Sequence, residues 1–239
     1  MEQAIRLELC ELGPDAHGLE SISPFCLKVH RALKFHGLSY ERRHAMRPSE
    51  HKHLSRTGQV PVLIIDGKPV GDSTAIIEAL EDLSSKSLVP ADLQQRTEAW
   101  FWEDYADQVL GLYVFAARWF DDRNLDALID EQFRPMPGFL KPWLPKLIRK
   151  RILKHMSSME FIRRGQHDYW RTFQEHLDRL EDRAPESGFW VGDALSVADI
   201  GLFPILHSLR TQLSQWQMQE IAKRPKLSAW LDRVDAATQ

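Results

Sequence analysis

The clearest hydrophobic pattern in the chain lies between residues 59 and 80. Residues 62–65 form an unbroken apolar run rich in β-branched side chains, which predicts a strand buried on both faces. Asp66-Gly67 is typical of a two-residue hairpin turn, so a short second strand should follow. After a break at residues 71–73, the apolar positions from Ile76 to Leu80 take helical spacing. This stretch therefore predicts a hairpin followed by a helix.

The segment before it alternates between strand and helix patterns. Residues 5–10 alternate apolar and polar positions and predict a strand, and residues 24–33 predict a helix that ends at Gly37. Residues 38–43 can form a second strand, parallel to the first, and the polar residues 44–58 a short irregular helix. The predicted order is β-α-β-α-β-β-α.

From residue 93 onward the pattern is helical. Residues 93–120 predict a long helix rich in aromatic side chains, and residues 159–183 predict a second long one. Residues 146–154 predict a short basic helix, and prolines interrupt the segment 121–145. At residues 195–200, Ser196 and Asp199 have the spacing of a capping box, a folding role.

These elements predict two domains, an N-terminal α/β domain followed by a C-terminal all-α domain that forms a helical bundle. The predicted boundaries are residues 1–83 for the first domain, 84–92 for a linker and 93–239 for the helical domain.

Composition narrows the class of protein. Of the 239 residues 43% are hydrophobic and 27% charged, with a net charge of −3, so the sequence indicates no nucleic-acid partner. No apolar run approaches the roughly 20 residues that span a membrane, and the N-terminus lacks the layout of a signal peptide. Only two cysteines, Cys10 and Cys26, favour a reducing compartment, so we expect a cytoplasmic protein.

Two short motifs carry a family resemblance. Gln59-Val60-Pro61 and Asp72-Ser73 flank the hairpin at the spacing seen in the thioredoxin-like domain of the cytosolic glutathione transferases. The Ser196-x-x-Asp199 motif resembles one in the helical domain of that family. The resemblance covers nearly the whole chain and is weakest at residues 121–165. It implies glutathione as co-substrate, no metal, a small-molecule electrophile and a homodimer.

The resemblance also implies a glutathione site. Asp72 and Ser73 would hold the γ-glutamyl group, and free N–H groups at a helix start do favour a carboxylate. The backbone of Val60, before a cis Pro61, would pair with the cysteinyl residue, and Gln59 would reach the glycyl end. The alternatives are a plain helix cap at Asp72-Ser73 and a solvated loop residue at Gln59.

Ser23 is the candidate catalytic residue. Ser23-Pro24-Phe25 at a helix start resembles the serine-type tau class, and the omega class with cysteine in place of the serine. A hydroxyl donating to the glutathione sulfur would lower the thiol pKa, as would the positive helix end. Ser23 can equally serve as a helix cap alone. Because the loop before it is longer than expected, Ser21 is the alternative at the catalytic point. This region has no tyrosine, which argues against a tyrosine-type transferase.

Other activities remain open. Cys26 occupies the second position of a Ser-x-x-Cys motif, so it is either the cysteine of a glutathione-dependent thiol transferase or reductase, or a small core residue. Residues 134–164 combine many positive charges with an apolar face. They would bind a membrane surface or a partner in a non-catalytic relative, but a packed face with solvated charges is the favoured interpretation. His44, His51 and His53 lack the spacing of a metal site.

The aromatic segment 93–120 would supply the electrophile pocket, since the family places that pocket between the two domains. Most of these aromatic side chains must be core. The residues predicted to line the pocket are Trp102, Tyr105 and Tyr113.

Overall fold

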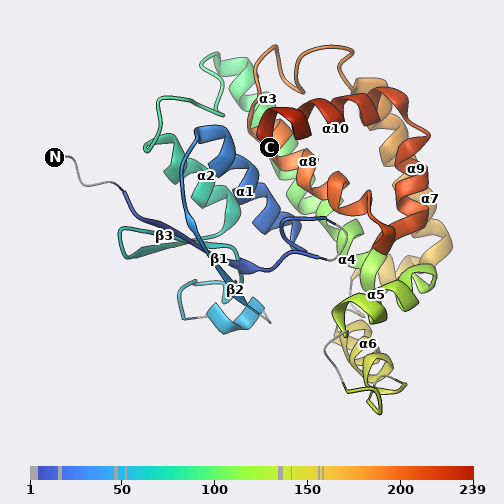
Figure 1. The fold of residues 1–239 in the computed structure, drawn as a ribbon. Helices are drawn as coiled ribbons and strands as arrows, with labels where there is room; N and C mark the ends of the chain where they lie inside the picture. The colour runs from blue at the N-terminus through green and yellow to red at the C-terminus, as the bar shows by residue number, and fades with distance from the viewer. Residues whose placement is uncertain are drawn as a thin grey trace.

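A computed structural model describes residues 5–15, 18–45, 48–51, 53–133, 137–140, 142–155, 157 and 159–239. It confirms the predicted fold class. A four-stranded mixed sheet with its helices forms the N-terminal domain, and helices form the rest (Figure 1). The predicted boundaries at 84–92 stay a prediction.

The sheet has the strand order β2-β1-β3-β4. Its strands are β1 (Leu7–Leu12), β2 (Glu41–Ala45), β3 (Val62–Ile65) and β4 (Lys68–Gly71). Strand β2 runs parallel to β1, and β3 runs antiparallel to both β1 and β4. The apolar run is thus hydrogen-bonded along both edges. Val62 and Leu63 are buried as predicted, whereas Ile64 and Ile65 are only half-buried.

Two predicted strand boundaries are wrong by a few residues. The first strand extends to Leu12, and the second begins at Glu41 rather than Leu38. The reason for the second shift is the end of helix α1 (Pro24–His36). Gly37 takes a left-handed conformation there, with φ 70°, and the Leu38 N–H donates to the Leu33 carbonyl at 3.1 Å. Leu38 therefore completes a helix cap instead of starting a strand.

Helix α1 and helix α2 (Ser73–Glu81) lie together against the sheet, and α8 (Val197–Leu209) packs against α1 from the helical side (Figure 1). The 3₁₀ turn η1 spans Pro48–His51. Leu9, Val29 and Leu63 are fully buried between these layers. The sequence-predicted apolar positions thus form the core that fixes α1 in place.

The predicted long aromatic helix is interrupted. It consists of α3 (Leu93–Tyr105), a π-helical turn η2 (Ala106–Leu110) and α4 (Gly111–Trp119). Such turns are rare and often occur at functional sites. A Cβ atom on Gly111 would lie 3.3 Å from the Phe25 ring, so the helix approaches α1 closely just after the turn.

The remaining helices complete the domain. They are α5 (Leu125–Gln132), α6 (Leu144–His155), α7 (Glu160–Arg183), α9 (Gln215–Ala222) and α10 (Pro225–Thr238), with 3₁₀ turns η3 (Asp122–Asn124) and η4 (Gln212–Ser214). Within α7, Gly165 departs from helical geometry with φ 77°. The predicted capping box at α8 is confirmed.

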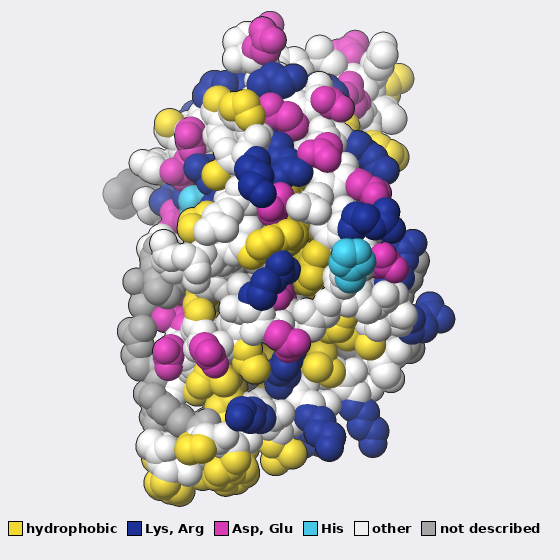
Figure 2. Space-filling view, turned by 90° about the vertical axis from the view of Figure 1, so that its right-hand side faces the viewer, with side chains coloured by type: hydrophobic (Ala, Val, Ile, Leu, Met, Phe, Trp, Pro, Cys, Tyr) yellow, Lys and Arg dark blue, Asp and Glu magenta, His cyan; other side chains and the backbone are white. Residues whose placement is uncertain are grey.

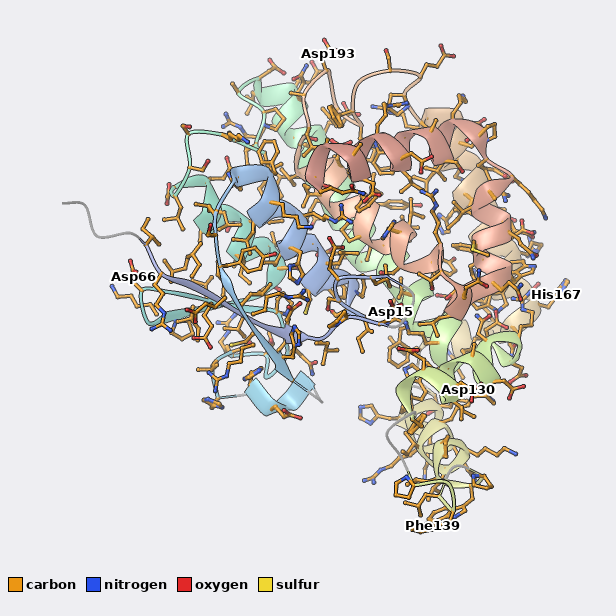
Figure 3. All side chains as sticks on the ribbon, in the orientation of Figure 1. Asp15, Asp66, Asp130, Phe139, His167 and Asp193 are labelled. Atoms are coloured by element: carbon orange, nitrogen blue, oxygen red, sulfur yellow. The ribbon has the colours of Figure 1, made fainter. Side chains whose placement is uncertain are left out.

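Helix α6 extends away from the body of the molecule, and Phe139 lies at that far end (Figure 3). Figure 2 shows hydrophobic side chains gathered at this end beside lysines and arginines. Of the predicted apolar face, Leu144, Ile148 and Ile152 are half-buried, as a packed face predicts, but Leu147 is 55% exposed. Phe139 and Trp143 are 76% and 52% exposed. Within the predicted segment 134–164, residues 134–136, 141, 156 and 158 lie outside the described residues. In the described part of the chain, no helix has the length and hydropathy to cross a membrane.

Candidate active site

A groove of about 400 Å³ brings together the two motifs that flank the hairpin. Its lining includes all five residues predicted to bind glutathione, which are Gln59, Val60, Pro61, Asp72 and Ser73. Helix α1 adds Phe25 to the lining, and the π-helical turn adds Asp107 and Gln108. The groove therefore lies between the two domains. The predicted cis bond between Val60 and Pro61 is confirmed.

Asp72 caps helix α2 at one wall of the groove. Its Oδ1 accepts hydrogen bonds from the backbone N–H of Thr74 at 3.0 Å and of Ala75 at 3.2 Å. Asp72 therefore caps α2, and it lines the groove as well. Its backbone has φ 84° and ψ 132°, a conformation that costs energy for any residue but glycine. Backbone strain of this kind is found mainly at ligand-binding sites.

Ser23 and Ser21 form a chain of hydrogen bonds before helix α1. The Ser21 hydroxyl is fully buried and donates to the Leu12 carbonyl at 2.6 Å. Its single proton is used in that bond and is not available to a ligand. It also accepts from the Ser23 N–H at 3.2 Å. The Ser23 hydroxyl accepts from the Cys26 N–H at 3.4 Å, a bond that uses an oxygen lone pair and leaves the hydroxyl proton available to donate.

Ser23 opens into a second cavity of about 320 Å³ between α1 and α4. The cavity has mostly apolar walls, lined by Leu12, Ile22, Pro24, Phe25, Gly111, Val114, Phe115 and Trp119, together with Ser23 and Arg118. Phe25 lines this cavity and the groove, so the two spaces adjoin. The groove and the cavity that Ser23 lines therefore share Phe25 as a common wall.

A buried ion cluster joins α1 to α3 and the π-helical turn, and one of its members, Asp107, lines the groove. Lys28 of α1 binds Glu103, and its Nζ lies 2.9 Å from Asp107 Oδ2. The Thr74 hydroxyl of α2 donates to Glu103 at 2.6 Å. Burial raises the pKa of Asp107 to about 6, although the neighbouring Lys28 cation opposes that shift. Within the described part of the chain, Asp107 Oδ1 has no hydrogen-bond partner.

Comparison with known proteins agrees with this architecture. Residues 24–124 match the family model described as glutathione S-transferase N-terminal domain, and residues 122–233 match the C-terminal domain model. Protein LigF of Sphingobium sp. is 30% identical over 246 residues, covering 96% of this chain and 90% of LigF. The chain belongs to the glutathione S-transferase family.

Two further similarities each cover more than nine-tenths of both proteins compared. The isoprene-epoxide–glutathione S-transferase of Rhodococcus sp. is 28% identical, covering 92% of this chain and 94% of that protein. The crystal structure of the beta-etherase LigF from Sphingobium sp. aligns with a TM-score of 0.67 at 27% identity, over 96% of this chain and 95% of that one. The protein is thus a glutathione transferase, and glutathione is its co-substrate. The N-terminal family match begins at residue 24, one residue after Ser23.

Cys26 lies inside the core of the transferase. Its side chain is fully buried, and that burial raises the pKa of its thiol to about 11. A thiolate at this position is therefore unfavourable at neutral pH, in contrast to reactive cysteines, whose pKa is lowered. Cys10 is buried too, and both cysteines are free.

The three aromatic residues predicted for the electrophile pocket lie in different surroundings. Tyr113 lines a third cavity, of about 360 Å³, which meets the groove at Gln108. The Tyr105 hydroxyl lies 2.6 Å from Nδ1 of His176, another residue of that lining. Trp102 packs edge-on against Trp190, with ring centroids 5.3 Å apart. Their role stays a prediction.

Two aromatic residues that line the cavity with Ser23 were not predicted from the sequence to line a pocket. Phe115 and Trp119 are four residues apart on α4, so they share one helix face, and this spacing was visible in the sequence. For Arg118, no pattern in the sequence indicated a position in this cavity. In the described residues, no group of three His, Cys, Asp or Glu side chains could hold a metal ion.

Proposed function

We propose that this transferase binds glutathione in the groove between the domains and that Ser23 stabilises its thiolate. The observation that carries the proposal is that the groove and the cavity lined by Ser23 are adjacent. The predicted binding residues line one groove, Ser23 lines the next cavity, and Phe25 borders both. The domain boundaries at 84–92 are part of the same proposal.

The groove offers a chemical match for each part of glutathione. The N-terminus of α2 at Ser73 favours the γ-glutamyl carboxylate. Asp107 lines the same groove, and its carboxylate suits the ammonium group. Val60 supplies backbone groups for the cysteinyl residue, and Gln59 supplies an amide for the glycyl end.

The proposed reaction is attack of the thiolate on a carbon electrophile. A carbon–sulfur bond forms, the bond from that carbon to the leaving group breaks, and its electron pair leaves with that group. Both full-length relatives carry names that refer to an ether or an epoxide, so an electrophile with a carbon–oxygen bond is the first class to assay. The aromatic cavity beside Ser23 suits an apolar or aromatic body.

The rival activities have less support. A thiol transferase would need a reactive Cys26, which is buried and has a raised pKa. A non-catalytic relative acting through residues 134–164 would use the exposed Phe139 and Trp143, and glutathione turnover would be absent. The proposal also includes a homodimer, which rests on the family resemblance. It includes a cytoplasmic location, which rests on the two free cysteines.

The double variant Asp72→Ala, Ser73→Ala should lower glutathione affinity at least about tenfold, because it removes groups that hold the γ-glutamyl end. Isothermal titration measures the change. Asp72→Ala also removes a helix cap worth about 1 kcal/mol. Asp92→Ala is the matched control, since Asp92 caps α3 through Gln95 N–H at 2.9 Å and lies outside the groove lining. Equal affinities for the double variant, Asp92→Ala and the unmodified protein would remove this site assignment.

Glutathione binding should weaken as the pH falls through about 6, because protonation of Asp107, whose pKa is about 6, removes the charge that faces the ammonium. The carboxyls and the amine of glutathione titrate well away from this range, at roughly 3.5 and 8. Titrations across this pH range should show the fall in the unmodified protein. Asp107→Asn keeps an acceptor for Lys28 and should bind more weakly with a flatter pH profile. The same pH dependence in both proteins would exclude Asp107 as its source.

A further inference from the structure

Arg118 is a cation in an otherwise aromatic and aliphatic cavity. It comes from α4 and lines the same cavity as Ser23, with Phe25, Phe115 and Trp119. Its Nη2 atom is buried and has no hydrogen-bond partner in the described part of the chain. Burial lowers the pKa of Arg118 to about 10, so the guanidinium remains charged at neutral pH.

Asp15, on the segment between β1 and α1, attracts Arg118 electrostatically and so opposes the lowering of its pKa. Figure 3 shows Asp15 where this segment meets the helical domain. The Oδ1 atom of Asp15 accepts the Leu19 N–H at 2.8 Å. The guanidinium therefore has a compensating charge near it, but its Nη2 has no hydrogen-bond acceptor among the described residues.

An unsatisfied buried donor on a charged group is costly, and the cost disappears when a ligand supplies the acceptor. A planar guanidinium fits a carboxylate with two parallel hydrogen bonds. The volume of about 320 Å³ is in the range of small-molecule sites, and aromatic walls favour a flat ring.

We infer that the electrophile is an aromatic compound carrying a carboxylate, which Arg118 binds while the ring packs between Phe25, Phe115 and Trp119. The anion then holds the molecule in the cavity that Ser23 also lines, with its reactive carbon toward the glutathione sulfur. This inference rests on the proposed function for the position of the sulfur. The binding of the carboxylate itself requires no turnover.

Equilibrium binding tests the anion site without catalysis. 3,5-Dinitrobenzoate carries no halide and, with no glutathione present, has no thiolate to react with. Its neutral carboxamide is a matched probe of nearly the same shape. We expect isothermal titration to show tighter binding of the carboxylate. Arg118→Met should remove about tenfold to a hundredfold of that preference, and Arg118→Lys should keep part of it. Lys146→Met, on the exposed side of α6, controls for the change in net charge.

A second variant changes affinity in the opposite direction. Asp15→Asn keeps an acceptor for the Leu19 N–H but removes the competing negative charge, so carboxylate binding should tighten. Equal binding of carboxylate and carboxamide by the unmodified protein would overturn the inference. So would a preference that survives in Arg118→Met, or one that weakens in Asp15→Asn.

Turnover separates this inference from the proposed function. With chlorodinitrobenzoate and its carboxamide, the glutathione sulfur bonds to the ring carbon and chloride leaves with the bonding electron pair. After division by the uncatalysed rates, the ratio of kcat/KM for carboxylate over carboxamide should fall about tenfold to a hundredfold in Arg118→Met, mainly through KM. An equal loss of kcat for both substrates would assign Arg118 to the thiolate and refute the inference. Binding of the carboxylate without turnover of either substrate would instead refute the conjugation reaction and leave the anion site intact.

Discussion

Replacing Asp199 with alanine should lower the free energy of unfolding by about 3–5 kcal/mol. The carboxylate is fully buried and accepts four hydrogen bonds, from the backbone of Trp190 and Ser196, the Ser196 hydroxyl and the Trp230 indole. Burial raises the pKa of Asp199, so placing the charge there is itself costly. The loss on substitution comes from the donors, which alanine leaves without an acceptor in the core. Urea denaturation followed by circular dichroism measures it.

Asp92→Ala is again the comparison, because it removes an exposed helix cap with one bond, to Gln95 N–H. That variant should lose about 1 kcal/mol. Asp199 lies in the helical domain, away from the groove, so folded Asp199→Ala should bind glutathione nearly as well as the unmodified protein. A loss no larger than that of Asp92→Ala would show that Asp199 does not hold the domain together.

Local signals account for what the sequence predicted well. The hairpin depends on the apolar run of β3 and on Asp66-Gly67, which are neighbours in the chain. The capping box depends on two residues three positions apart. The second strand was misplaced because Leu38 carries an apolar side chain suited to a strand, whereas the helix cap at Gly37 takes its backbone N–H.

The features that the sequence did not predict depend on contacts between residues far apart in the chain. Lys28 meets Glu103 across 75 positions, and no spacing rule connects them. The π-helical turn that places Asp107 and Gln108 in the groove has no strong residue signature, so the segment appeared as one helix. The position of Arg118 beside Ser23 depends on the packing of α4 against α1, which only the folded chain defines.

The directions of the hydrogen bonds distinguish Ser21 from Ser23, which the sequence alone could not do. Both serines fit the loop equally well as residue types. Ser21 gives its proton to the Leu12 carbonyl, and Ser23 accepts from Cys26 and borders the cavity. A thiolate needs a donor, so the geometry favours Ser23 for that role.

Ser23→Ala should therefore reduce kcat about tenfold to a hundredfold, because a hydrogen bond to a charged group is worth about 1.5–3 kcal/mol. Glutathione affinity should change little, since the proposed binding groups at Val60, Asp72 and Ser73 line the groove and Ser23 lines the adjoining cavity. The pKa of the bound glutathione thiol should rise in the variant, because the thiolate loses its donor while the neutral thiol is affected less. Thiolate absorbance, followed as a function of pH, measures that shift.

Two matched variants make the assignment specific. Cys26→Ala removes a buried thiol with a pKa near 11 and should leave both the turnover and the thiolate pKa nearly unchanged. Ser21→Ala removes the bond to the Leu12 carbonyl, so it should lower stability more than it raises the thiolate pKa. An inactive Cys26→Ala beside an active Ser23→Ala would identify a thiol transferase. If only Ser21→Ala raises the thiolate pKa, the catalytic hydroxyl is Ser21, and the donor must rotate away from Leu12 when glutathione binds.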